Sequence, residues 1–356
     1  MTATSRDQRE GQGGTSGDMP EEFAPRHLLR RLVALLVFVG LVAVAVGSLP
    51  GLGHLRQRFA AADGWLLAVV GLMKLGSCLS NVIAFRDVFC PRMSWRFSYD
   101  LAMAEQGTNV LVPTGGAGGL ALGAWALRQG GVPTEHIARR SVAFFVLTSI
   151  PNFAVAAVLG PLLLTGLFSG QIPTAVTIVF SSLAWGVSIA VAALPLWLGR
   201  IDRHKESGRI AGKLRAAAGA LDSGIRDTGR LIAEKRWRAI LGAFGYLFFD
   251  IGALIIGYAA FGGGFPLGPL VFAYVIGQLG GLIPLPAGIG GTDGGLIGAL
   301  VLFGSPFSQA AAAVLAYRLF QLGVPAALGS VAFISMRRRL TGSAAPAVDC
   351  APLSAS

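Results

Sequence analysis

The stretch Pro286-Ala287-Gly288-Ile289-Gly290-Gly291 breaks a long hydrophobic segment, and Pro113-Thr114-Gly115-Gly116-Ala117-Gly118-Gly119 breaks another in the same way. Adding 173 to the earlier residue numbers places Pro113 on Pro286, and it also places Gly131-Val132-Pro133 on Gly304-Ser305-Pro306. Glycine and proline interrupt helices, and at membrane depth the freed backbone groups are tolerated only inside protein or around a cavity. Two such breaks at matching places in a membrane protein are the best sequence indicator of a transport site.

The composition indicates an integral membrane protein. Of 356 residues, 53% are hydrophobic and 13% are charged, and several apolar runs approach the roughly 20 residues that cross a bilayer. The formal net charge of +11 comes from Lys and Arg in loops beside these runs. Anionic lipid headgroups, and not nucleic acid, are therefore the expected counter-charge.

Six full spans and two shorter broken segments are expected, which predicts an all-α fold. The spans cover 30–50, 64–85, 141–166, 173–198, 238–262 and 309–335. The broken segments, 98–129 and 268–303, each have two arms of roughly 15 residues, which is short for a span of about 20. We therefore predict two re-entrant helical hairpins. Residues 26–340 form this membrane domain, and the polar leader 1–25 and the tail 341–356 are expected to be disordered.

Loop charges orient the chain, because cytoplasmic loops are enriched in Lys and Arg. The loop 199–238 carries eleven such residues, whereas 262–267 and 304–308 carry none. We expect this loop and both termini to lie in the cytoplasm, with the protein in the inner membrane. Three full spans then separate the hairpins, so the first repeat, about 64–166, and the second, about 238–336, are inverted. Eight ordinary spans, with Gly and Pro serving only packing, are the alternative.

The loop 199–238 also has an apolar stripe at helical spacing, formed by Ile210, Leu214, Ala217, Leu221 and Ile225. Such a helix can lie on the anionic inner leaflet. The simpler interpretation, which we expect, is a solvated connector.

Polar residues inside hydrophobic segments are costly and usually face a cavity or a partner. Glu105 and Asn109 lie four residues apart, on one face of a half-helix of the first hairpin. The second hairpin carries Gln278 and Asp293, and the last span carries Arg318, whose planar charge suits phosphate. Half-helix N-termini would add amide donors for an anion. The glycines of these breaks that we include in the substrate path are Gly115, Gly118, Gly288 and Gly291.

Internal ion pairs that only fix helix packing are the alternative interpretation of these charges. Lys74 and Asp250, in two other spans, are the main candidates. Examples of such pairs are Lys74 with Glu105, and Asp250 with Arg318.

Motifs of catalysis are absent from the sequence. It contains no G-x-S-x-G, Walker A or H-E-x-x-H motif, and its Cys and His residues are scattered. We therefore expect no enzymatic activity, no cofactor and no metal site.

The string Leu285-Pro286-Ala287-Gly288-Ile289-Gly290-Gly291-Thr292-Asp293, followed by Gly304 and Tyr317-Arg318-Leu319, resembles the lysylphosphatidylglycerol synthase transmembrane region, a family of flippase-like membrane proteins. Asn109, Pro113, Gly115 and Gly118 are similar to its first-half motif. The resemblance covers most of residues 28–336.

This resemblance implies movement of lipids such as aminoacylated phosphatidylglycerol between leaflets, and in some members an association with lipid-linked sugar or hopanoid pathways. Family members commonly have Glu where this chain has Asp293. Leu120, Gly123 and Phe145 stand where members often carry charged residues, so a less charged site is expected here.

These features together predict a flippase-like transporter of the cytoplasmic membrane that moves an anionic, aminoacylated or polyprenyl-linked lipid headgroup. Membrane lipids are the expected ligands, a separate lipid-modifying enzyme is an expected partner, and the oligomeric state is left open. Two alternatives remain: a secondary transporter of a small anion, and a non-transporting membrane partner of a cell-envelope glycosyltransferase.

Overall fold

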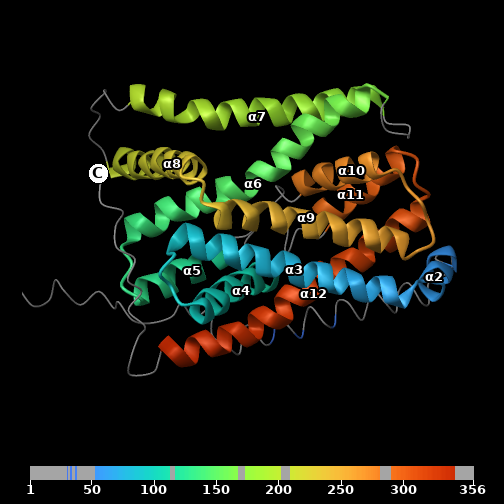
Figure 1. The fold of residues 1–356 in the computed structure, drawn as a ribbon, viewed down its shortest axis with the longest axis horizontal. Helices are drawn as coiled ribbons and strands as arrows, with labels where there is room; N and C mark the ends of the chain where they lie inside the picture. Colours follow the sequence, from blue (N-terminus) through green and yellow to red (C-terminus); the bar gives the residue numbers. More distant parts are fainter. Residues whose placement is uncertain are drawn as a thin grey trace, which may run out of the picture.

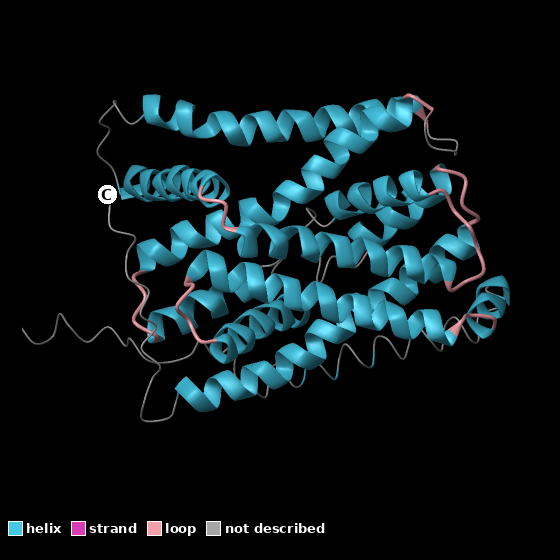
Figure 2. Ribbon diagram, viewed as in Figure 1, coloured by secondary structure: helices cyan, strands magenta, loops and turns pink. Residues whose placement is uncertain are grey.

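A computed structural model describes residues 53–112, 117–166, 173–201, 209–280 and 290–340, together with residues 30, 33 and 37. Every element in this part of the chain is a helix (Figure 2). The leader 1–25, the tail 341–356 and nearly all of the predicted span 30–50 lie outside the described residues.

Five helices are long and apolar enough to cross a membrane, and they confirm five of the predicted spans, although α6 begins seven residues before its predicted start (Figure 1). Lipid rather than water suits their outer faces, because large apolar side chains such as Val179, Ile189 and Phe248 are exposed on them. These helices are α3 (Gly64–Phe89), α6 (Thr134–Leu164), α7 (Thr174–Ile201), α9 (Trp237–Ala259) and α12 (Phe307–Leu340).

Each broken segment forms two short helices on either side of its proline-glycine stretch. They are α4 (Trp95–Leu111) and α5 (Ala117–Gln129) in the first half, and α10 (Leu267–Gly280) and α11 (Gly291–Leu302) in the second. Their lengths of 17, 13, 14 and 12 residues fall below the roughly 20 of a full span. The connecting residues 113–116 and 281–289, which hold Gly115 and Gly288, lie outside the described part of the chain.

The arms of each hairpin pack directly on each other. In the first hairpin the side-chain oxygen of Asn109 accepts a hydrogen bond from the backbone N–H of Gly119 at 2.8 Å. In the second hairpin the backbones of Gly280 and Gly291 approach so closely that a Cβ on Gly280 would lie 2.2 Å from the carbonyl oxygen of Gly291. Glycine is therefore needed where the two arms of the second hairpin meet.

The sequence repeat is also a repeat of local structure. Gly131 and Gly304 both adopt a positive φ, 87° and 97°, which side chains disfavour. After each glycine the next N–H donates to the carbonyl five residues earlier, at 3.0 Å in the first copy and 2.9 Å in the second. This is the Schellman ending of a helix, and Pro133 and Pro306 then precede the next helix. The starts of α3, α4, α5 and α6 precede those of α9, α10, α11 and α12 by 173, 172, 174 and 173 residues.

The two hairpins open toward opposite ends of the helix bundle (Figure 1). We call one end the basic end, because Arg139, Arg236 and Arg339 form ion pairs there with Asp227, Asp87 and Asp100. The first hairpin opens at the basic end. The second opens at the far end, where the N–H of Asp63 donates to the carbonyl of Ala260 at 2.9 Å. This arrangement is the one expected of an inverted repeat, whose placement across a membrane stays a prediction.

Helix α8 (Arg209–Ala233) forms within the predicted basic loop, as its apolar stripe indicates. Its second half is docked on α6, because the carboxylate of Asp227 pairs with Arg139 at 2.9 Å and the hydroxyl of Thr228 donates to the carbonyl of Ala143 at 3.3 Å. Asp227 and Thr228 are buried. The expectation of a solvated connector was therefore wrong for this half of the helix. The apolar stripe predicts a helix, but it does not indicate which other helix packs against it.

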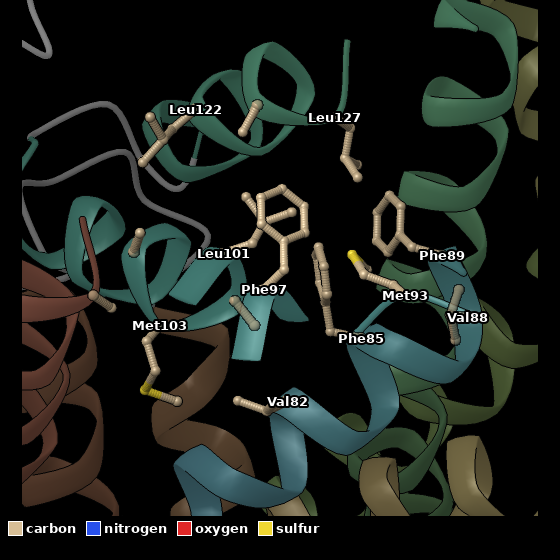
Figure 3. Close-up of a cluster of buried hydrophobic side chains, with 14 of the residues drawn as sticks. Val82, Phe85, Val88, Phe89, Met93, Phe97, Leu101, Met103, Leu122 and Leu127 are labelled. Atoms are coloured by element: carbon tan, nitrogen blue, oxygen red, sulfur yellow. The ribbon is translucent and has the colours of Figure 1, made fainter. Parts of the chain in front are cut away.

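The hydrophobic core divides into two clusters, one around each hairpin. In the first cluster side chains of α3, α4 and α5, among them Phe85, Phe97 and Leu127, converge between the helices (Figure 3). The second cluster surrounds α10 and α11 and includes Phe272 and Leu300. Each hairpin is thus surrounded by its own packed cluster.

Helices α4 and α12 cross backbone against backbone. A Cβ on Gly107 would lie 2.8 Å from the Cα of Gly329 and 2.9 Å from the carbonyl oxygen of Pro325. A Cβ cannot be placed at these distances unless the neighbouring atoms shift, and backbone atoms cannot shift as easily as the end of a side chain. This crossing fixes the first hairpin to the last span.

We expect Gly107→Ala to lower the melting temperature of the purified protein, because overpacking costs about 1–3 kcal/mol. Gly186→Ala is the matched control, since a Cβ at that helical position on α7 meets nothing within 4 Å. It should leave the melting temperature unchanged or raise it. Equal melting temperatures for both variants would contradict the tight crossing.

Cysteine labelling tests the orientation of the bundle. Gly264 is exposed at the far end and Glu234 is exposed at the basic end. An impermeant thiol reagent should label a Gly264→Cys variant in intact cells, and a Glu234→Cys variant only after the membrane is permeabilised. The wild-type chain sets the background, and the reverse pattern would overturn the predicted topology.

Candidate functional site

Two adjacent residues of α12 contact two acidic groups of the second half, one of them buried and one partly exposed. Tyr317 reaches Asp250 on α9, and Arg318 reaches Asp293 on α11. Because neighbouring helical residues point in different directions, one turn of α12 joins two distinct polar clusters. We describe them in turn as the Asp250 cluster and the Asp293 cluster.

The Asp250 cluster is sealed inside the bundle. One carboxylate oxygen of Asp250 pairs with the ammonium group of Lys74 on α3. The other accepts hydrogen bonds from the hydroxyls of Tyr274 and Tyr317, each at 2.6 Å. Asp250 is 0% exposed and Lys74 is 3% exposed, and the Lys74 ammonium also lies 5.7 Å from the ring centroid of Tyr317.

This geometry corrects the pairs suggested by the sequence. Lys74 pairs with Asp250, and neither Glu105 nor Arg318 takes part in that pair. A buried charge pair is tolerable when further hydrogen bonds satisfy it, and here two phenols do so. The cluster joins α3, α9, α10 and α12, and its burial and saturation indicate a structural anchor.

The Asp293 cluster is only partly closed. Nε of Arg318 donates to one carboxylate oxygen of Asp293, and the Arg318 side chain also donates from Nη1 to Gln321 at 2.7 Å. The second oxygen of Asp293 accepts the backbone N–H of Gly290 at 3.0 Å and so caps the start of α11. The Asp293 side chain is 21% exposed and that of Arg318 is 9% exposed.

Asp293 therefore places a negative charge where a guanidinium and a helix N-terminus both favour an anion. A helix N-terminus attracts negative charge, and a guanidinium has five N–H donors in a planar fork. The fork matches phosphate as well as carboxylate. Beside Asp293, the α11 residues Gly294 and Gly298 are exposed and have no neighbouring atoms within 4 Å of a would-be Cβ. The cluster can thus be approached along this face of α11.

The polar pair has no counterpart in the first half. Subtracting 173 from Asp293 and Arg318 gives Leu120 and Phe145, which are exposed apolar residues on α5 and α6. The resemblance predicted a less charged site. Two of the positions where family members often carry charges, Leu120 and Phe145, are the ones equivalent to the ion pair. The two halves repeat in fold but differ in chemistry.

Glu105 and Asn109 lie apart from the Asp293 cluster, within the first hairpin. Asn109 bonds the first turn of α5 at Gly119. Glu105 lies beside Gly123, where an added Cβ would be 2.9 Å from its Oε2 atom. Among the described residues neither side chain has a hydrogen bond or ion pair with Asp293 or Arg318. The structure therefore does not join the four residues into one contact network.

The remaining predicted site residues lie on the hairpins. Gly118 is buried in the first turn of α5, and Gly291 is the first residue of α11. Gln278 is half-buried near the end of α10. Within the described ranges, no three His, Cys, Asp or Glu side chains cluster as metal ligands would.

Sequence reasoning missed three polar contacts. Tyr274, Tyr317 and Gln321 provide the hydrogen bonds around Asp250 and Arg318. Gln321 could have been found, because it lies three residues after Arg318 on the same helix face. No comparable sequence pattern indicated that the tyrosines bind Asp250, since an aromatic side chain in a membrane span usually belongs to the hydrophobic core.

The sequence model of the lysylphosphatidylglycerol synthase TM region matches residues 31–329, a range that contains both hairpins and both polar clusters. The chain belongs to this family. As a member of the lysylphosphatidylglycerol synthase TM region family it is an integral, multi-pass membrane protein. No curated protein matches the chain.

A double-mutant cycle tests the anchoring role of the Asp250 cluster. Lys74→Met or Asp250→Asn alone should destabilise the protein by about 3–5 kcal/mol, because each leaves a buried charge without its partner or counter-charge. The double variant should recover most of the loss, since no charge remains. Thermal unfolding in detergent measures this, and additive losses in the double variant would contradict the pairing.

Proposed function

We propose that this protein moves a phosphate-bearing lipid headgroup between the leaflets of the cytoplasmic membrane. The observation that carries the proposal is the Arg318–Asp293 pair at the start of α11. Here a buried arginine and a helix N-terminus, two features that attract anions, are held by one partly exposed carboxylate. The carboxylate is an internal substitute that a headgroup phosphate can replace.

The exchange preserves charge balance at every stage. While the site is empty, Asp293 neutralises Arg318, so neither charge is left alone in a low-dielectric environment. When a phosphate arrives, it accepts the guanidinium hydrogen bonds, and Asp293 turns toward its exposed side or toward a cationic group on the headgroup. A bidentate arginine-phosphate contact is stronger than a neutral hydrogen bond, which favours the exchange.

A lipid fits the surroundings of this site better than a free small anion does. The exposed face of α11 at Gly294 and Gly298 lies next to Asp293 and is made of small residues, which leave room for a headgroup. Large apolar side chains near it, among them Val301, Leu302 and Leu319, are exposed as lipid-facing residues are. A headgroup can therefore reach Arg318 while its acyl chains stay in the bilayer.

Hairpins that open toward opposite ends support alternating access, because each can admit the headgroup from one side. With the basic end in the cytoplasm, the first hairpin faces the inner leaflet and the second faces the outer leaflet. The protein acts in this proposal as a transporter without a chemical step, and a separate enzyme would supply or use the lipid.

Arg318 variants test the proposal in proteoliposomes that contain fluorescent phosphatidylglycerol. Arg318→Ala should reduce headgroup translocation to the background of protein-free vesicles, because no phosphate partner remains. Arg318→Lys keeps the charge but loses the planar fork, so it should retain part of the activity. Arg226→Ala is the matched control, since Arg226 is exposed on α8 and pairs only with Asp222 among the described residues.

A purely structural role for Arg318 gives a different result. In that case Arg318→Gln combined with Asp293→Asn should restore both the melting temperature and translocation, because no unpaired charge remains. The proposal expects restored stability without translocation. Full translocation by a folded Arg318→Ala variant would refute it.

A further inference from the structure

Glu105 is a buried carboxyl group that the proposed headgroup contact does not use. It lies on α4 and is 8% exposed. Among the described residues it has no hydrogen bond and no ion pair, in contrast to Asp250 and Asp293, which each have several partners. An unpaired acid at membrane depth is rare and marks a functional group by default.

The Glu105 side chain faces a small hollow between four helices. The hollow is too small to admit a water molecule. It is lined by Phe85 and Phe89 of α3, Leu120, Gly123, Ala124 and Leu127 of α5, and Ser141 of α6. Ser141 is the one polar side chain among the described residues that line it with Glu105. No charged group lies there to balance an ionised carboxylate.

The size and lining of the hollow decide which ligand it can take. The hollow does not admit even a water molecule, so an aminoacyl or sugar headgroup does not fit. A Ca²⁺ ion needs six to eight oxygen ligands, and Glu105 with Ser141 supplies far fewer. A proton needs only the carboxylate and access to water.

We propose that Glu105 is the proton-carrying site that couples a transmembrane pH difference to headgroup movement, an inference that rests on the proposed function. The Glu105 carboxylate takes a proton from water on one side of the membrane and forms an O–H bond. That bond breaks when the hollow opens to the other side, and the proton returns to water there. No other donor or acceptor is consumed.

The position of Glu105 explains how a proton can act on the hairpin. Glu105 and Asn109 lie one turn apart on α4, and they meet Gly123 and Gly119, one turn apart on α5. The neutral acid is compatible with arms that exclude water. The ionised form needs water, so it favours arms that separate at Gly123 and open the hollow. Protonation thus biases the first hairpin between a closed and an open arrangement.

Other charged groups near α4 are held elsewhere. The described lining residues of α3, α5 and α6 include no titratable side chain. Helix α12 packs on α4 at Gly107. Of its four arginines, Arg318 and Arg339 pair with Asp293 and Asp100, and Arg337 and Arg338 lie in its last turn. Glu105 is therefore the titratable side chain among the described residues that line the hollow.

The experiment uses the full-length protein in proteoliposomes with fluorescent phosphatidylglycerol and a trapped pH-sensitive dye. For the wild type we expect an imposed pH difference to accelerate headgroup translocation and to be accompanied by proton movement. Glu105→Gln, which keeps the shape of the side chain, should abolish proton movement and the response to the pH difference. Glu105→Asp should retain part of both. Asp222→Asn, an acid-to-amide change on the surface of α8, is the matched control and should behave as the wild type.

Two readouts separate this inference from the proposed function. Lipid translocation by the wild type that is indifferent to pH, without proton movement, overturns the role of Glu105 and leaves the transporter intact. Proton movement without lipid translocation supports Glu105 and overturns the transporter. Infrared spectra of the purified protein give a test that needs no transport: a carboxylic-acid band that changes with pH and is missing in folded Glu105→Gln supports the site, and an unchanged band contradicts it.

Discussion

The ion pair between Arg318 and Asp293 sets the charge balance of the second hairpin. A guanidinium buried among helices at membrane depth requires a permanent anion, and Asp293 supplies it. Asp293 can do so because the hydrophobic segment breaks before α11, where Gly290 adopts a φ of 91° and its N–H binds the same carboxylate. The helix break, the cap and the charge pair are therefore one unit, and the phosphate exchange that we propose would act on all three.

The two halves share a helix order but have different chemistry. The second hairpin carries the Arg318–Asp293 pair, whereas the equivalent positions Leu120 and Phe145 are apolar. The first hairpin instead buries Glu105, which has no hydrogen-bond or ion-pair partner among the described residues. The saturated Lys74–Asp250 pair lies between the halves and joins α3 to α9. In our proposals the second hairpin binds the headgroup and the first responds to protons, while the buried Lys74–Asp250 pair links the two halves.

Patterns with a strong physical cause were predictable from the sequence. Long apolar runs predicted the five described spans. Gly131 and Gly304 occupy matching places in the repeat, and both adopt a positive φ that glycine favours. Which charged residues pair with each other was not predictable, because Lys74 and Asp250 are 176 residues apart and meet only through helix packing. The same holds for the docking of Asp227 on α6, which depends on a tertiary contact. Sequence thus located the charged residues of the site, and packing determined which of them meet.

Native mass spectrometry of the gently purified protein tests most directly whether Arg318 holds a lipid phosphate. The wild type and Arg226→Ala should both retain an anionic phospholipid, while folded Arg318→Ala should lose it. Because the measurement reports binding and not transport, it is independent of direction and energy source. Equal retention of the lipid by Arg318→Ala and the wild type would contradict the site.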